Sequence, residues 1–168
     1  MGKNGSVRYV AVLGGLLGVV AIIIGLIPSD ASWWYVRETF TNASAILNAF
    51  GFFTLNNGSI VFAADYLILI AGLSFLIGSL LIIFSASKKK KAIAIFSGFL
   101  MIIGIVIFCV GLYAKNNWES VNVLLFWLNT ESNVFFGESF TVRWGLGFSF
   151  YLAIVGAAIG TIGALVMK

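Results

Sequence analysis

Residues 66–87 read YLILIAGLSFLIGSLLIIFSAS and contain no charged side chain. Asp65 precedes this stretch and Lys88 follows it, so 22 consecutive residues lack a formal charge. At a rise of about 1.5 Å per residue, a helix of this length crosses the hydrocarbon core of a bilayer, which is roughly 30 Å thick. The stretch therefore predicts a transmembrane helix.

Three other stretches share this property. Twenty-one residues lie between Arg8 and Asp30, 23 between Lys91 and Lys115, and 24 between Arg143 and Lys168. Runs beyond about 20 apolar residues satisfy their backbone polar groups as helices and not as barrel strands. We predict an all-α integral membrane protein with four transmembrane helices, at about residues 9–29, 66–87, 92–114 and 144–167.

The composition agrees with a membrane protein. Of 168 residues, 61% are hydrophobic and 10% are charged, and the mean hydropathy is +1.07. A soluble domain carries about 25% charged residues, so this class is excluded. The chain has no His and one Cys, which excludes a disulfide scaffold and a zinc module. We expect Cys109 to be a packing residue, and we predict no metal or cofactor site and no catalytic residue.

The charges are distributed unequally between the two sides of the predicted bundle. Lys3, Arg8, residues 88–91 and Lys168 give one side seven basic and no acidic residues, whereas the other side has three basic and six acidic residues. By the positive-inside rule, the termini and the hairpin at 88–91 are cytoplasmic, and the loops 30–65 and 115–143 are extracytoplasmic. The basic balance thus indicates a cell-membrane topology and contact with anionic lipid, and no nucleic-acid partner.

The two halves of the chain resemble each other. At a shift of 86, residues 18–26 (GVVAIIIGL) align with residues 104–112 (GIVIFCVGL), and at a shift of 85, Tyr66 aligns with Tyr151 and Trp33 with Trp118. This pattern predicts one membrane domain, residues 1–168, built from two tandem parallel hairpin repeats at about 8–87 and 92–168. The alternative is chance matching between segments rich in Gly, Ile and Leu.

The outer loops show helical periodicity. Their apolar residues recur at steps of three and four, the period of one face of an amphipathic helix. In the first loop Ser32 is suited to an N-cap position and Gly51 to a helix stop, so we predict one outer amphipathic helix in each half. The first predicted stripe consists of Trp33, Val36, Phe40, Ala43, Leu47 and Phe50. The second consists of Trp118, Val121, Leu125, Leu128, Ser132 and Phe135, five of which are apolar.

Turn residues and aromatic residues add detail to these loops. Asn57-Gly58 and Gly137-Glu138 suit two-residue hairpin turns, which would give a small outer sheet. All five Trp and four of the five Tyr fall in the outer loops or at the outer ends of the spans. Such one-sided placement predicts an outer platform that anchors on the bilayer or covers the bundle. The alternative interpretation is an aromatic groove for a ligand or a partner subunit.

Small residues mark the predicted helix contacts. Pairs four or seven positions apart allow two backbones to approach closely. They are Gly14 with Gly18, Ser74 with Gly78, Gly104 with Gly111, and Gly156 with Gly160. Such spacing predicts a compact four-helix bundle.

Three polar features of the outer side are also candidates. Asp65 could pair with Arg143 at the membrane interface, and the alternative role of Asp65 is to bind an ion. Asn42 and Asn57 begin N-x-S sequons and are candidate glycosylation sites.

The order of spans and loops resembles the layout of claudins and tetraspanins. The chain lacks the paired loop cysteines of both groups and the Cys-Cys-Gly of tetraspanins. The likeness therefore covers topology alone and implies no site residue.

We expect a non-catalytic scaffold or accessory subunit of a cell-envelope membrane assembly. Its partners would be the lipid bilayer and other membrane subunits or further copies of the chain. A small channel or transporter is the alternative, and Ser74, Ser79 and Thr161 are the polar groups that it would find within the membrane. A quinone- or lipid-handling subunit of a membrane enzyme is a further alternative.

Overall fold

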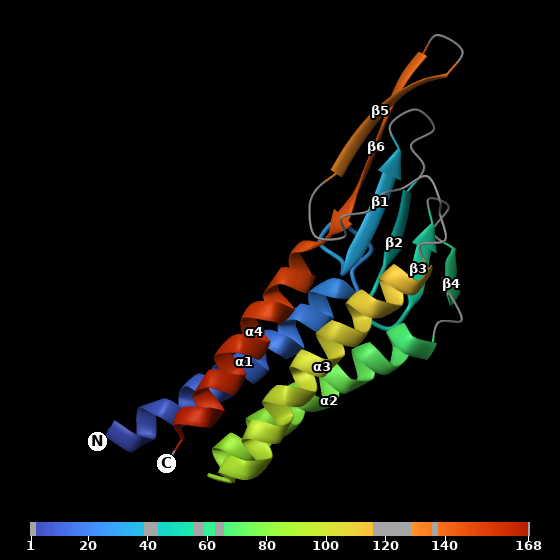
Figure 1. Cartoon of the computed structure of the whole chain (residues 1–168). Coiled ribbons are helices and arrows are strands. Elements are labelled where there is room, and N and C mark those ends of the chain that lie inside the picture. The colour runs from blue at the N-terminus through green and yellow to red at the C-terminus, as the bar shows by residue number, and fades with distance from the viewer. Residues whose placement is uncertain are drawn as a thin grey trace.

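Four long helices form a bundle in the computed structural model, which describes residues 3–38, 44–55, 59–62, 66–115, 129–135 and 138–167. Each helix is long and apolar enough to cross a membrane. Both termini and the connection between the second and third helices lie at one end of the bundle (Figure 1). The helices are α1 (Lys3–Gly25), α2 (Tyr66–Ser87), α3 (Lys91–Lys115) and α4 (Phe148–Val166).

A six-stranded sheet stands at the opposite end of the bundle (Figure 1). Its order is β4-β3-β2-β1-β6-β5, and every neighbouring pair is antiparallel. The strands are β1 (Trp34–Glu38), β2 (Ser44–Leu47), β3 (Phe52–Leu55), β4 (Ile60–Phe62), β5 (Asn129–Phe135) and β6 (Glu138–Leu146).

Pairing between β1 and β6 joins the two outer loops into one sheet. The register runs from Trp34 opposite Leu146 to Glu38 opposite Val142. The small outer sheet predicted from the turn residues is therefore confirmed, whereas the all-α fold class is wrong for the loops. The protein is mostly helical and carries a sheet at one end.

The amphipathic helix predicted over the first outer loop is wrong. Residues 34–38 and 44–47 are strands, and the aromatic and β-branched run Trp34, Tyr35 and Val36 favours this conformation. Tyr35 and Ile46 are register partners and both are buried, although the helical stripe includes neither. Steps of three and four over so short a segment did not distinguish a helix from two paired strands.

The second outer stripe falls mostly outside the described residues. The structure does not describe residues 116–128, which include Trp118, Val121, Leu125 and Leu128. Phe135 is the last residue of β5, so the predicted helical stripe is wrong at this position.

Both predicted hairpins are present as paired strands. In the first, Thr54 lies opposite Ile60, and Asn57-Gly58 falls outside the described residues. In the second, Phe135 lies opposite Glu138, so residues 136–137 connect the strands. The connection is one residue earlier than the predicted Gly137-Glu138 turn.

Two helices differ from their predicted spans. α4 begins at Phe148, since residues 144–146 belong to β6. α1 begins at Lys3 and ends at Gly25, and the Ile27 N–H donates to the Ile24 carbonyl (3.0 Å) in the turn that leads toward β1. One residue, Gly147, separates β6 from α4, and residues 26–33 separate α1 from β1.

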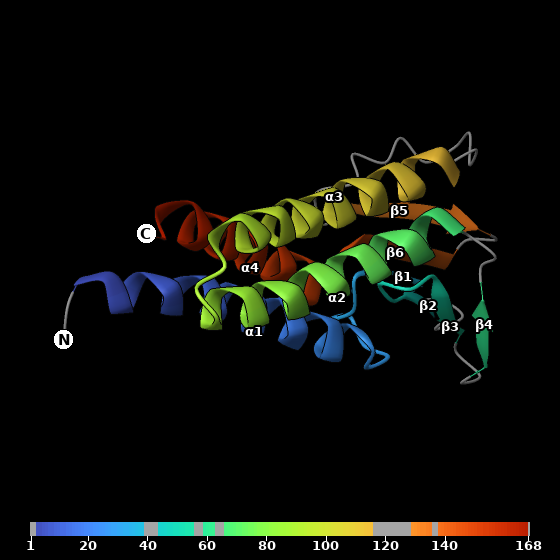
Figure 2. The same ribbon diagram turned by 90° about the horizontal axis from the view of Figure 1, so that it is seen from below.

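Each helix has two close neighbours around the bundle. α1 packs against α4, and α2 packs against α3; the α1–α2 and α3–α4 contacts close the ring (Figure 2). Residues buried inside the bundle include Phe75, Ile82, Met101, Phe108 and Phe150.

Candidate functional site at the junction of bundle and sheet

Trp33 occupies the centre of the junction. Its side chain has no exposed surface, and its ring makes edge contacts with Phe75 of α2 (5.4 Å between centroids), Phe108 of α3 (4.9 Å) and Phe150 of α4 (5.5 Å). T-shaped contacts at these distances are favourable for aromatic pairs. The residue immediately before β1 therefore fills the end of the bundle among three helices.

α1 completes this enclosure through Gly25. A Cβ placed on Gly25 would collide with the indole ring of Trp33, with Nε1 at 2.7 Å. Only a residue without a side chain fits beside the indole here. All four helices thus contribute to the site that Trp33 fills.

Hydrogen bonds tie the segment before β1 to both helices that flank it. The Ser32 hydroxyl lies 2.7 Å from the Gly25 carbonyl and 3.1 Å from the Leu47 carbonyl, and can donate to either. The Ser149 N–H donates to the Ala31 carbonyl at 2.9 Å. These bonds link the end of α1, strand β2 and the start of α4.

Gly147 allows the closest approach at the junction. Its N–H donates to the Trp33 carbonyl (3.1 Å), and a Cβ at this position would collide with the Ser32 carbonyl. The backbone that precedes α4 therefore lies directly on the backbone that precedes β1.

Two buried polar atoms at the junction have no hydrogen-bond partner among the described residues: Trp33 Nε1 and Ser149 Oγ. Both approach Gly25, at 2.7 Å and 3.1 Å from the position of a Cβ on that residue. Neither group is ionisable near neutral pH, so the pair offers hydrogen bonding and no proton-transfer chemistry.

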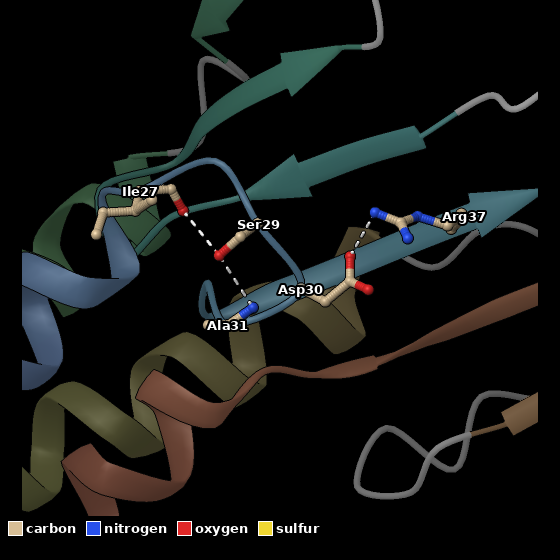
Figure 3. Close-up of polar contacts among 5 residues, drawn as sticks. All are labelled: Ile27, Ser29, Asp30, Ala31 and Arg37. Atoms are coloured by element: carbon tan, nitrogen blue, oxygen red, sulfur yellow. Dashed lines mark hydrogen bonds and ion pairs between the residues drawn. The ribbon is translucent and has the colours of Figure 1, made fainter.

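The charged contact nearest the junction was not predicted. Arg37 on β1 pairs with Asp30 at 3.0 Å, and both side chains are about half exposed (Figure 3). Ser29 shapes the intervening turn: its Oγ accepts from the Ala31 N–H at 3.3 Å (Figure 3). The predicted partner pair is untested, because Asp65 lies outside the described residues; the Arg143 backbone is opposite Arg37 in the sheet.

The predicted small residues lie between helices. A Cβ on Gly14 of α1 would collide with the backbone of Gly160 of α4, and one on Gly156 would reach the Gly18 nitrogen at 2.9 Å. A Cβ on Gly104 would lie 2.9 Å from atoms of Phe75. Gly78 contacts α3, Gly111 contacts α2, and Ser74 is half buried.

The centre of the bundle is filled by Met101 and by small residues. Met101 is fully buried, and its side chain reaches the Cβ positions of Gly18 (2.8 Å) and Gly78 (2.9 Å). The buried hydroxyls of Ser79 and Ser97 donate to carbonyls of their own helices, at 2.8 Å and 2.7 Å. Met101 of α3 thus contacts both α1 and α2 in the interior of the bundle.

The remaining predicted outer residues are distributed over the sheet and its turns. Val36 is half buried in β1, Leu47 is buried in β2, and Phe50 packs against α2 near Gly72. Phe40, Asn42 and Asn57 fall outside the described residues.

The sequence pattern predicted that Trp33 belongs to an outer stripe. It did not indicate that Gly25, Gly147 and Ser149 lie around it. The available signal was the position of Phe108 and Phe150 six residues from the outer ends of their predicted spans, with Phe75 near the middle of its own span.

The chain matches no known protein family and no curated protein sequence.

Proposed function

We propose that the chain is a multi-pass membrane protein that acts as a non-catalytic scaffold or accessory subunit of a cell-envelope assembly. Membrane insertion is supported by the outer surface of the bundle. Large apolar side chains are exposed along all four helices, among them Ile23, Leu73, Phe96 and Ile162. Soluble monomers rarely expose apolar patches beyond about 300–600 Å², whereas lipid tails accept such a surface.

The filled bundle axis is the observation that favours a structural role over transport. A solute path needs space and polar groups that face it at mid-membrane depth. Here Met101 lies between Gly18 and Gly78, and the hydroxyls of Ser79 and Ser97 are bonded within their own helices. A bundle packed in this way is suited to holding shape and not to conducting a solute.

The outer sheet is the surface that we assign to partner subunits. Ile60 on β4 is 68% exposed, and Phe52 and Leu55 on β3 are exposed as well. Strands β3 and β4 lie at the end of the molecule opposite the termini (Figure 1). Apolar side chains on a sheet that is anchored to the bundle through Trp33 offer a fixed surface for another protein.

Orientation follows from charge, with the termini and residues 88–91 in the cytoplasm. Single cysteines test it in a Cys109→Ser background. Ile60→Cys should react with a membrane-impermeant maleimide on intact cells, and Lys89→Cys should react only after permeabilisation. The reverse labelling would overturn the orientation.

We further infer that the two helical hairpins derive from duplication. Exchange of the halves maps α1 onto α3 and α2 onto α4. It therefore maps the close α1–α4 contact onto the close α2–α3 contact. The outer loops have diverged, because among the described residues the first supplies four strands and the second supplies two.

Co-purification combined with reconstitution tests the function. We expect crosslinking in native membranes to capture a defined partner subunit, and Ile60→Asp to lose it while Ile60→Leu retains it. We also expect no solute flux through liposomes that contain the purified chain. Flux without a partner would support a channel instead, and a bound quinone in the purified protein would support a redox subunit.

A further inference from the structure

We propose that Arg8 and the four lysines at 88–91 form a binding site for the phosphate-bearing headgroup of an anionic phospholipid. This site lies at the end of the bundle that carries the termini. The proposal rests on the membrane insertion argued above, and it adds a specific ligand and the residues that hold it.

The four lysines are presented by a tight turn. α2 ends at Ser87 and α3 begins at Lys91, and all four lysine side chains are exposed. The Lys90 N–H donates to the Ser85 carbonyl at 2.8 Å, and Lys89 has φ 58°, a left-handed conformation that favours glycine. Local turn geometry therefore does not explain why lysine stands at this position.

Helix electrostatics explains only half of this cluster. Cations after the C-terminus of α2 are favourable, but Lys90 and Lys91 lie at the N-terminus of α3, where the helix dipole favours anions. The first turn of α3 contains no acidic residue. A bound anion would offset the repulsion that these two lysines create there.

Helix register brings Arg8 to the same level as the lysine turn. Gly18 of α1 lies against Ser79 of α2, and Gly15 lies against Ile82. A step of three residues toward the N-terminus of α1 therefore corresponds to a step of three residues toward the C-terminus of α2. Arg8 is seven residues before Gly15, about two helical turns, and so projects from the same face of α1. On α2, seven residues after Ile82 is Lys89, which therefore lies at the level of Arg8.

The Arg8 guanidinium lacks a counter-ion in the described part of the chain. Its Nε is buried without a hydrogen-bond partner there. A terminal nitrogen bonds to the Tyr9 hydroxyl at 3.1 Å, and the guanidinium lies 5.0 Å from the centre of the Tyr9 ring. Both contacts are with Tyr9, and the sequence has no Asp or Glu in residues 1–29, 66–118 or 139–168. No acidic side chain of this end of the chain can therefore supply the anion.

Exposed aromatic rings beside the lysines identify the anion as a lipid. Phe84 lies one helical turn before Lys88 on α2, Phe96 lies five residues after Lys91 on α3, and each is 62% exposed. A phosphate bound at the lysines would place the acyl chains of its lipid along these rings. Free phosphate would use the cations but gain nothing from the aromatic surface.

Lipid titration of the delipidated full chain tests the site. In a neutral detergent, phosphatidylglycerol should raise the thermal unfolding midpoint and stay bound in native mass spectrometry, and phosphatidylcholine should do neither. Arg8→Gln and the combined Lys88→Gln, Lys89→Gln, Lys90→Gln and Lys91→Gln variant should bind phosphatidylglycerol about fivefold more weakly for each cation removed. Arg37→Gln at the opposite end should bind as the parent protein does.

Each contrary result has a defined meaning. Equal phosphatidylglycerol binding by Arg8→Gln, the lysine variant and Arg37→Gln would overturn the site. The same midpoint shift with inorganic phosphate would overturn the assignment to lipid. If the fourfold variant does not fold, the Lys88→Gln and Lys89→Gln pair takes its place under the same criterion.

Flotation separates this inference from the proposed function. A chain that inserts should float with phosphatidylcholine vesicles, whatever the fate of the headgroup site. Failure to float would contradict membrane insertion. Flotation without any preference for phosphatidylglycerol would contradict the headgroup site alone.

Discussion

The interior of the bundle and the junction with the sheet differ in what occupies the space between elements. Within the bundle, helices meet where side chains are absent, as at Gly14 and Gly160. At the junction, one large ring, Trp33, fills the space, and Gly25 and Gly147 lie against the segment that carries it. Enlarging a glycine should therefore damage the bundle, and truncating Trp33 should damage the junction.

Polar groups follow the same division. In the bundle the Ser79 hydroxyl bonds to a carbonyl of its own helix, one turn away. At the junction the Ser32 hydroxyl reaches carbonyls of α1 and β2. Loss of a hydroxyl should therefore matter where it connects two elements and matter little where it stays within one.

Truncation of Trp33 should have the largest effect. Trp33→Ala leaves a cavity among Phe75, Phe108 and Phe150 and should reduce the free energy of unfolding by about 3–5 kcal/mol. Thermal unfolding in detergent measures the loss. We expect the sheet to separate from the bundle first, with faster amide exchange in β1 and β6 than in the helices.

Trp34→Ala is the matched control for this truncation. Trp34 is half buried and has one described ring contact, with Phe53 at 6.5 Å, so its loss should be clearly smaller. Equal losses for the two tryptophans would mean that the junction is not centred on Trp33.

Addition of one methyl group at Gly14 should have the next largest effect. Gly14→Ala forces Cβ into the backbone of Gly160 and should cost about 1–3 kcal/mol. Gly111→Ala meets a side-chain carbon of Ile68 at 3.0 Å and no other atom closer than 3.6 Å, so the loss should be smaller or absent. Thermal midpoints in one detergent compare the two, and a Gly14 variant as stable as the Gly111 variant would contradict the close helix contact.

The difference between the two regions also explains what could be predicted from sequence. The four helices follow from length and apolarity, because a run such as residues 66–87 has few alternatives in a bilayer. The outer loops are short, mixed in polarity and paired across the chain. β1 lies beside β6, more than 100 residues away in sequence, and no local pattern records that pairing.

The junction was hidden for the same reason. Its residues come from segments around 25–33, 75, 108 and 147–150, and only the sheet and the bundle together bring them to one place. Glycines such as Gly25 and Gly147 resemble any other glycine of an apolar sequence. Their role depends on the backbone or ring that lies against them, which is a property of the assembled fold.

Removal of a hydroxyl group should change the free energy of unfolding less than the tryptophan and glycine substitutions do. Gly25 is the last residue of α1, so its carbonyl has no donor within the helix. Ser32→Ala removes the hydroxyl that lies 2.7 Å from this carbonyl oxygen. The cost should be about 1–2 kcal/mol of unfolding free energy. Ser79→Ala should stay within about 0.5 kcal/mol, because a hydroxyl that bonds back into its own helix adds little. Denaturant midpoints measured in parallel test this, and similar losses would remove the distinction between the two kinds of hydrogen bond.

The smallest effect should come from the ion pair beside the junction. Asp30 and Arg37 are each about half exposed, so water and salt screen their attraction, and Asp30→Asn should cost at most about 1 kcal/mol. The loss should largely disappear in about 1 M salt, where the screening length falls to about 3 Å. Arg37→Gln should cost the same, and the double variant should cost no more than either single one, because each change breaks the same pair. A loss that exceeds that of Ser32→Ala, or that persists at high salt, would show that this pair carries part of the connection between bundle and sheet. The stability of the junction would then depend on charge as well as on the buried ring of Trp33.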